Sequence, residues 1–167
     1  LEKMFSWEWQ GTMALTEPEA GSSLAHIISE ATLLEDGNYN IKGQKIYISA
    51  GDHDQTENII HLLLARIKGA PKGTKGISLF VVPKFLPEDE VLKDNDVLTA
   101  GIYGKMGQKG YTAAHLMFGE HAKCKGYLVG EANKGLNYMF QMMNEARIGT
   151  GTLAMATASA AYHCSLT

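Results

Sequence analysis

Residues 27–49 read IISEATLLEDGNYNIKGQKIYIS, two apolar runs separated by the turn sequence Asp36-Gly37-Asn38. Asp and Asn tolerate the left-handed backbone of a tight hairpin turn, and Gly adopts it freely. The sequence therefore predicts two strands, Ile27–Leu34 and Tyr39–Ser49, paired as a hairpin.

The second of these strands changes the side on which its apolar residues lie. Tyr39 and Ile41 share one parity, whereas Ile46 and Ile48 share the other. Because Gly43 stands between the two pairs, we expect a β-bulge at this glycine that re-aims the side chains after it.

Further short strands are predicted between residue 11 and about residue 120. Both faces of Gly76–Val82 are apolar, which indicates a central strand. The polar, proline-containing stretch Pro83–Asp96 is expected to be a surface loop. The other predicted strands are Asn58–Ile67 and those around Leu98–Tyr103 and Ala113–Phe118. Short strands separated by turn signals are typical of a barrel or a sandwich.

The period of the apolar residues changes after Gly130. Steps of three and four residues then connect Leu136, Met139, Phe140, Met143 and Arg147. The pattern predicts one helix of about 30 residues that runs to Tyr162. We expect two domains, residues 1–130 and 131–167. Both ends of the sequence look cut, so the helix is interpreted as the first of a bundle whose other helices lie outside this chain.

The composition is that of a globular protein. Of the 167 residues, 45% are hydrophobic and 20% are charged, and the net charge is −3. This charge offers no basic field for a nucleic acid. The longest apolar stretch, Ile59–Ala65, is far shorter than the roughly 18 residues of a membrane span. With no secretory signal and two widely separated cysteines, the sequence predicts a soluble, cytoplasmic protein without a disulfide framework.

The residues by themselves point to no particular chemistry. Asp52-His53-Asp54 is the densest group of metal-ligand types, but it is better explained as a solvated turn, and we expect no metal site. The histidines are scattered singly, and the serines and glycines form neither a nucleophile elbow nor a phosphate-binding loop.

Two segments carry a family resemblance. MALTEPEAGS at residues 13–22 and GQKIYISAG at residues 43–51 resemble the two flavin-contacting stretches of the acyl-CoA dehydrogenase family. Four further segments follow in the family's order: GISLFVV at 76–82, KMG at 105–107, LVGE at 128–131 and MMNEAR at 142–147. The details favour the branch of long bacterial members that includes 3-methylmercaptopropionyl-CoA dehydrogenases. The resemblance covers residues 9–165 and implies an antiparallel β-barrel, the family's middle domain, followed by one long C-terminal helix.

The resemblance also implies that FAD is the cofactor. Met13, Leu15 and Thr16 are then expected along the flavin, with backbone amides and the Thr16 hydroxyl donating to its polar edge. Tyr47 stands at the family's Trp position and Ser49 at its Thr position. By this similarity the Tyr47 ring covers the flavin face, although it is smaller than the indole, and the Ser49 hydroxyl bonds near N5.

The implied acyl-CoA site draws on two parts of the chain. Gly21 and Ser22 match positions whose backbone meets the acyl-CoA, and Asn144 and Arg147 match helix positions along the pantetheine channel. The match is incomplete, since Ser23 replaces the usual Asp and Asn144 stands where many relatives carry Asp. Lys109-Gly110-Tyr111 departs from the family's commoner Arg-Gly-Ser, so no role is transferred there.

The reaction implied by the resemblance is α,β-dehydrogenation of an acyl-CoA thioester. A carboxylate removes the α-proton, the β-hydrogen leaves as hydride to FAD, and an electron-transfer flavoprotein accepts the electrons. In most of the family the base is a Glu beyond the end of this chain. The alternative position on the helix is occupied by Ala146, and Glu145 is turned about 100° away. We therefore expect no catalytic residue within the chain, an inactive fragment, and a parent that is a homodimer or homotetramer.

Two alternatives remain open. A flavin oxidase or monooxygenase of the same fold would pass electrons to oxygen. A non-catalytic binding or assembly module would retain the barrel without the chemistry, although the presence of Thr16 and Ser49 counts against it.

Overall fold

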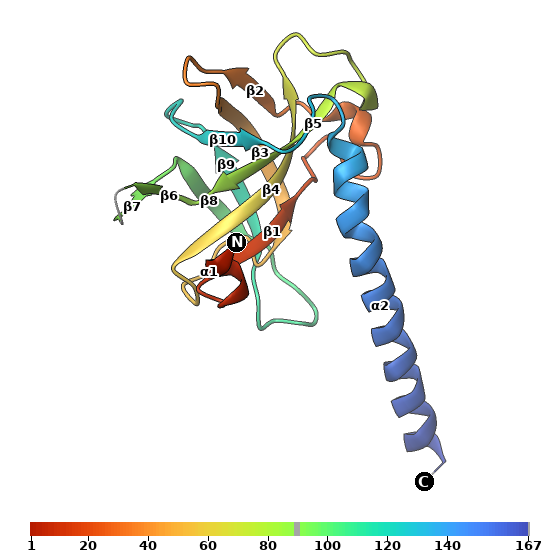
Figure 1. Cartoon of the computed structure of the whole chain (residues 1–167). Coiled ribbons are helices and arrows are strands. Elements are labelled where there is room, and N and C mark those ends of the chain that lie inside the picture. The colour runs from red at the N-terminus through yellow and green to blue at the C-terminus, as the bar shows by residue number, and fades with distance from the viewer. Residues whose placement is uncertain (89–90, 167) are drawn as a thin grey trace. The chain divides into compact units, whose positions relative to one another are not determined.

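A computed structural model describes residues 1–88 and 91–166 (Figure 1). The chain divides into two compact units, residues 1–136 and residues 137–167, and each is described by itself. The first unit contains all the strands of the described chain, and the second contains most of one long helix.

Five strands of the first unit close into a barrel. They are β2 (Glu30–Leu33), β3 (Tyr39–Ser49), β4 (Asn58–Ile67), β5 (Ile77–Pro83) and β10 (Lys125–Leu128). Going around the ring, β2 pairs with β4, β4 with β5, β5 with β10, β10 with β3, and β3 with β2. All these pairings are antiparallel except β2 with β4, which is parallel. The predicted mainly β barrel is confirmed.

The remaining elements extend this ring. β1 (Trp9–Ala14) pairs in parallel with residues 58–63 of β4. β9 (Ala113–Phe118) pairs with β3 on one edge and with β8 (Val97–Ile102) on the other. Short helical turns precede β1, β2 and β5: α1 (Glu2–Phe5), η1 (Leu24–His26) and η2 (Thr74–Gly76).

The core lies inside the barrel and against β1 and β9. Its fully enclosed side chains include Ile41, Leu63, Phe80, Leu116 and Phe118. Six of the seven residues of β5 are buried, and the strand lies between β4 and β10. The prediction that this strand is central is therefore confirmed.

The hairpin turn lies where the sequence places it. Leu34 N donates to Asn38 O at 2.8 Å, and Gly37 has a φ of 80°. Of the predicted first strand, Ile27–Leu34, only Glu30–Leu33 is strand. The residues before it follow a 3₁₀ turn, and the amides of Ile28 and Ser29 bond to a side chain instead of a neighbouring strand.

The expected bulge at Gly43 is wrong. Gly43 and Lys45 pair in register with Phe118 and Leu116 of β9, and the register shifts only between Lys45 and Ile48. Two residues of β3, Ile46 and Tyr47, there lie opposite the single residue His115 of β9, which is a β-bulge. The apolar pattern misplaced it because Lys45 occupies an inward position that the pattern treats as polar surface.

The expected surface loop at Pro83–Asp96 is also wrong. Phe85–Glu88 (β6) and Val91–Asp94 (β7) pair as a small antiparallel sheet of their own, and residues 89 and 90 lie outside the described chain. Pro87 is tolerated because a two-stranded sheet consists only of edges. The sequence likewise missed β10, whose four residues include Gly126 and one charged side chain.

The second unit confirms the predicted long helix. The helix α2 runs from Gly135 to Ser165, and the hydroxyls of Thr150, Thr152 and Thr157 bond to carbonyls four residues earlier. No helix within residues 1–88 and 91–166 is long and apolar enough to cross a membrane.

One buried histidine makes the fold sensitive to acid. His61 on β4 is fully buried, and its Nδ1 lies 2.7 Å from Thr12 Oγ1 on β1. Burial, reinforced by the charge of Lys84, lowers the pKa of His61 from 6.5 to about 3. Below pH 6.5 the His61 imidazole therefore binds a proton in the unfolded chain but stays neutral in the folded chain down to about pH 3.

We predict that the free energy of unfolding falls by roughly 4 kcal/mol between pH 6.5 and pH 3 on account of His61. Urea denaturation across this range measures it. His61→Gln removes the titrating group and should make the free energy of unfolding depend less on pH in this range. The same substitution at the exposed His26 should leave the pH dependence as in the wild type. Equal acid slopes for the wild type and His61→Gln would contradict the prediction.

Candidate functional site

The end of β1 and the middle of β3 come together on one surface. Ile46 N donates to Thr16 O at 2.9 Å, so Thr16 lies beside the bulge of β3. Along β1, Thr12 and Ala14 are buried, and the alternation of a strand turns Met13 outward on the opposite face. Leu15, next in alternation, is also only partly buried. The structure thus joins two segments that are about thirty residues apart in the chain.

A buried ion pair holds this junction. The side chains of Lys45 and Glu17 are 0% and 1% exposed. Lys45 Nζ donates to Glu17 Oε1 at 2.8 Å, to Leu15 O at 3.0 Å and to Leu64 O at 2.7 Å. An ammonium group has three hydrogens, and three acceptors are present, so the buried cation is fully satisfied.

Glu17 extends the same network into the loop that follows. Its carboxylate accepts the backbone N–H of Ile28 at 2.7 Å and that of Ser29 at 3.2 Å. Burial raises the pKa of Glu17, but the charge and hydrogen bonds of Lys45 outweigh it and leave the pKa below its usual value. Burial also lowers the pKa of Lys45 to about 8, against the attraction of Glu17. At neutral pH the pair is charged and ties residues 15–29 to the barrel.

The bulge presents Tyr47 to the outside of the barrel. Tyr47 has a φ of 57°, which is strained backbone for a residue other than glycine, and it is 59% exposed. Ser49 is also exposed and pairs with Ala113 of β9. Thr16, Tyr47 and Ser49 therefore belong to one patch, with Met13 and Leu15 beside it.

The four residues expected at the acyl-CoA site lie in different units. Gly21 and Ser22 are exposed in the loop after β1, where a Cβ added to Gly21 would meet no atom within 4 Å. Asn144 and Arg147 lie on α2, where Arg147 Nη1 donates to Asn144 Oδ1 at 3.4 Å and the guanidinium lies over the Phe140 ring. The two pairs belong to separate units, and their common role stays a prediction.

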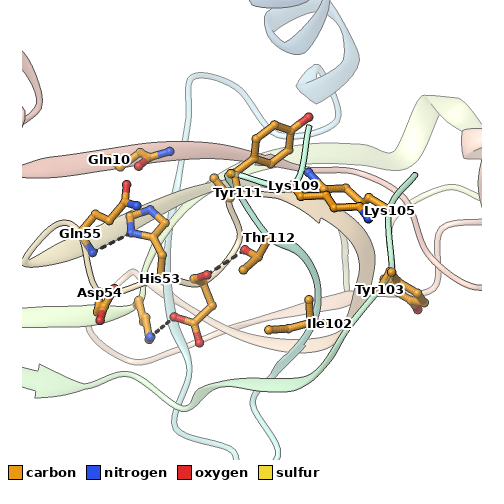
Figure 2. Close-up of a pocket in the computed structure, with 15 residues that line it drawn as sticks. Gln10, His53, Asp54, Gln55, Ile102, Tyr103, Lys105, Lys109, Tyr111 and Thr112 are labelled. Atoms are coloured by element: carbon orange, nitrogen blue, oxygen red, sulfur yellow. Dashed lines mark hydrogen bonds and ion pairs between the residues drawn. The ribbon is translucent and has the colours of Figure 1, made fainter. Parts of the chain in front are cut away.

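A cleft of about 920 Å³ opens on the first unit near this patch. Figure 2 shows Tyr103, Lys105 and Lys109 along one side of it and Gln10, His53 and Gln55 along the other. At its floor Asp52 binds Lys84 and Thr99, and Thr112 Oγ1 donates to Asp52 O at 2.8 Å. Within the described ranges, no three His, Cys, Asp or Glu side chains are grouped as metal ligands.

Sequence reasoning missed the buried ion pair. It assigned no role to Glu17 or to Lys45, although both lie in the segments that carry the family resemblance. The available signal was the parity of β3, because Lys45 shares the inward positions with Ile41. A lysine at an inward position needs a buried partner.

Comparisons with known proteins agree with this geometry. Residues 12–120 match the family model described as acyl-CoA dehydrogenase, middle domain. The chain is 44% identical to a butyryl-CoA dehydrogenase of Syntrophomonas wolfei and 44% identical to the 3-methylmercaptopropionyl-CoA dehydrogenase of Ruegeria pomeroyi. Each alignment covers 99% of this chain and 28% of the relative.

Solved structures give the same result. The Caenorhabditis elegans protein ACDH-11 in complex with C11-CoA superposes with a TM-score of 0.67 at 26% identity, over 83% of this chain and 22% of that one. An acyl-CoA dehydrogenase of Bacillus anthracis complexed with FAD gives a TM-score of 0.60 at 26% identity, over 80% and 20%. The chain belongs to the acyl-CoA dehydrogenase family, as its motifs predict, and spans about a quarter of the length of these curated relatives.

We predict that Lys45→Met lowers the free energy of unfolding by about 3–5 kcal/mol, because it leaves the Glu17 carboxylate buried without a counter-charge. Lys45→Met combined with Glu17→Gln should recover part of this loss, since the amide oxygen still accepts the N–H groups of the loop. Urea denaturation of the three proteins measures both effects.

The control for this prediction is Lys93→Met. Lys93 pairs with Glu88 at 2.7 Å, but both side chains are about half exposed, so its loss should cost less than about 1 kcal/mol. If Lys45→Met were as mild as Lys93→Met, the ion pair would not hold the junction.

Proposed function

We propose that this chain is the flavin-binding middle part of an enzyme that dehydrogenates an acyl-CoA thioester between its α and β carbons. The observation that carries the proposal is the Lys45 junction, which places Thr16 beside the bulge of β3 on one outward surface. The relatives support the same reaction class, since they are named butyryl-CoA dehydrogenase and 3-methylmercaptopropionyl-CoA dehydrogenase.

The surface suits FAD, which when bound supplies the acceptor for the hydride. A flavin needs an apolar or aromatic face to lie on and donors at its polar edge. Tyr47 offers an exposed ring, Met13 and Leu15 offer partly buried apolar side chains, and Thr16 and Ser49 offer hydroxyls. A family structure from Bacillus anthracis is named as a complex with FAD.

The contribution of this chain is preorganisation. We propose that the backbone amides of Met13, Leu15 and Thr16 and the Thr16 hydroxyl donate toward the polar edge of the flavin. Lys45 fixes the Leu15 carbonyl, and Ile46 N fixes that of Thr16, so these donors need no reorganisation when negative charge develops. Ser49 supplies a second hydroxyl from β3.

We propose that Gly21 and Ser22 contact the acyl-CoA substrate, and that Asn144 and Arg147 on α2 contribute to substrate binding in the parent protein. The proposed domains are residues 1–130, which hold the flavin, and residues 131–167, which begin a helical domain. No carboxylate at 144–147 matches the position of a base, so we assign the base to a part of the parent protein outside this chain. An electron-transfer flavoprotein is the proposed electron acceptor, and the parent is proposed to be a homodimer or homotetramer.

The test is an absorbance spectrum of the purified full-length parent protein before and after anaerobic addition of a saturated acyl-CoA. We expect flavin bands that bleach with substrate and stay bleached until an acceptor is added. Flavin that does not bleach would overturn the dehydrogenase assignment. Rapid reoxidation by air would favour the oxidase or monooxygenase alternative, and absence of flavin would favour the non-catalytic module.

We predict that Thr16→Val weakens FAD binding to the parent protein about tenfold, through the loss of one hydrogen bond at the polar edge of the flavin. Fluorescence titration of the apoprotein with FAD measures it. Thr32→Val on β2 removes a hydroxyl whose contact is Glu30, and it should leave FAD affinity unchanged. Equal affinities for Thr16→Val and the wild type would remove Thr16 from the site.

The substitution Gly21→Ala tests whether Gly21 is needed for substrate binding and not for the stability of the fold. A Cβ at Gly21 meets no atom of this chain and the backbone there is unstrained, so we predict an unchanged thermal midpoint. Because the substrate needs close approach to this backbone, the Kd for acyl-CoA should rise at least about tenfold, as measured by flavin spectral titration. Gly110→Ala, which is equally open, is the control. An unchanged Kd would contradict the role of Gly21.

A further inference from the structure

Tyr47 does not stand alone on the surface. Its ring lies against the ring of Tyr103, with 4.2 Å between the centroids and 33° between the planes. Tyr103 follows the end of β8, where its backbone N–H donates to Ala113 O at 2.8 Å. The second ring is therefore anchored to β9, which is the neighbour of the strand that carries Tyr47.

A second ring, that of His115, lies near Tyr103. His115 on β9 lies nearly parallel to it, with centroids 6.5 Å apart and planes at 20°. His115 Nε2 is in turn 2.8 Å from Gln44 Oε1 on β3. The row therefore runs from Tyr47 on β3 through Tyr103 to His115 on β9, and the hydrogen bond of His115 leads back to β3 at Gln44, three residues before Tyr47.

The row of rings limits the orientations that the Tyr47 ring can adopt. The ring of an exposed tyrosine on a strained bulge can point in several directions. A ring that moves among them offers no fixed face to a planar ligand. Contact with Tyr103 restricts those directions, because offset aromatic pairs favour particular geometries. The two rings together also present a wider aromatic surface than one phenol.

We propose that Tyr103 is a positioning residue of the flavin site, which holds the Tyr47 ring in the orientation that covers the flavin. This inference rests on the proposed function, because it takes Tyr47 as a flavin contact. It goes beyond the family match in assigning a role to Tyr103 on the contact geometry alone. Tyr103 also lines the cleft of Figure 2, and its ring lies near those of Tyr47 and His115.

The experiment uses the full-length parent protein with Tyr103→Leu, Tyr103→Phe, Tyr47→Leu and the double variant of the two leucine substitutions. The readouts are the Kd for FAD and the fluorescence lifetime of the bound flavin, which shortens when a tyrosine ring is held against it. Tyr111→Leu is the matched control, because Tyr111 lines the same cleft but contacts Lys105 and Gln108 instead of Tyr47.

The expected result has three parts. Tyr103→Leu weakens FAD binding by about three- to tenfold and lengthens the flavin lifetime. Tyr103→Phe, which keeps the ring, and Tyr111→Leu match the wild type. In the Tyr47→Leu background, Tyr103→Leu adds no further change, as expected of a residue that acts through Tyr47.

Other outcomes overturn the inference. If Tyr47→Leu changes the flavin lifetime and Tyr103→Leu does not, Tyr103 has no positioning role while the proposed function stands. If Tyr103→Leu lowers the thermal midpoint of the apoprotein but leaves the lifetime unchanged, its role is structural. If the parent protein binds no flavin, both the inference and the proposed function fail.

Discussion

The structure depends on one lysine that carries a charge inside the barrel. Burying an ammonium group costs several kcal/mol unless its charge is paired and each of its protons is accepted. Lys45 meets this condition through Glu17, Leu15 O and Leu64 O, which belong to two segments, the stretch after β1 and the strand β4. The need to satisfy one cation therefore fixes β3 and β4 to the segment after β1.

The shape of the candidate flavin surface follows from this constraint. Because Lys45 occupies an inward position, strict alternation would turn Tyr47 inward and Ile48 outward unless the strand gains an extra residue. The register shift between Lys45 and Ile48 supplies it, and it turns Tyr47 outward at a φ of 57°. The same segment places Ile46 N against Thr16 O. The buried pair, the bulge and the exposed aromatic ring are thus parts of one arrangement, which Tyr103 completes from the neighbouring strands.

Local patterns in the sequence predicted the elements that local forces determine. The Asp36-Gly37-Asn38 turn and the strands Tyr39–Ser49 and Asn58–Ile67 have the expected bounds, because turn chemistry and runs of apolar residues define them. The small sheet of β6 and β7 could not be predicted, since it forms from polar segments that pair only with each other. The strand β10 has too few apolar residues to stand out, and its place depends on partners about fifty and eighty residues earlier.

Only part of the candidate site could be predicted from the sequence. Its motifs identified the family and the two stretches that we propose to contact the flavin, but the contacts between the stretches depend on side chains whose partners are distant in sequence. Lys45 and Glu17 are 28 residues apart, and Tyr47 and Tyr103 are farther apart still. No periodicity relates such residues, so only the closed barrel reveals that they touch.

The central claim is that Lys45 builds the flavin surface from two stretches of the chain. The most direct measurement is a crystal structure of the full-length parent protein with its flavin bound. The account predicts a flavin ring that lies across Thr16 and Tyr47, with Lys45 Nζ still bonded to Leu15 O and Glu17 beneath it. A flavin bound elsewhere, or a Lys45 side chain turned to solvent while the flavin is in place, would contradict the account.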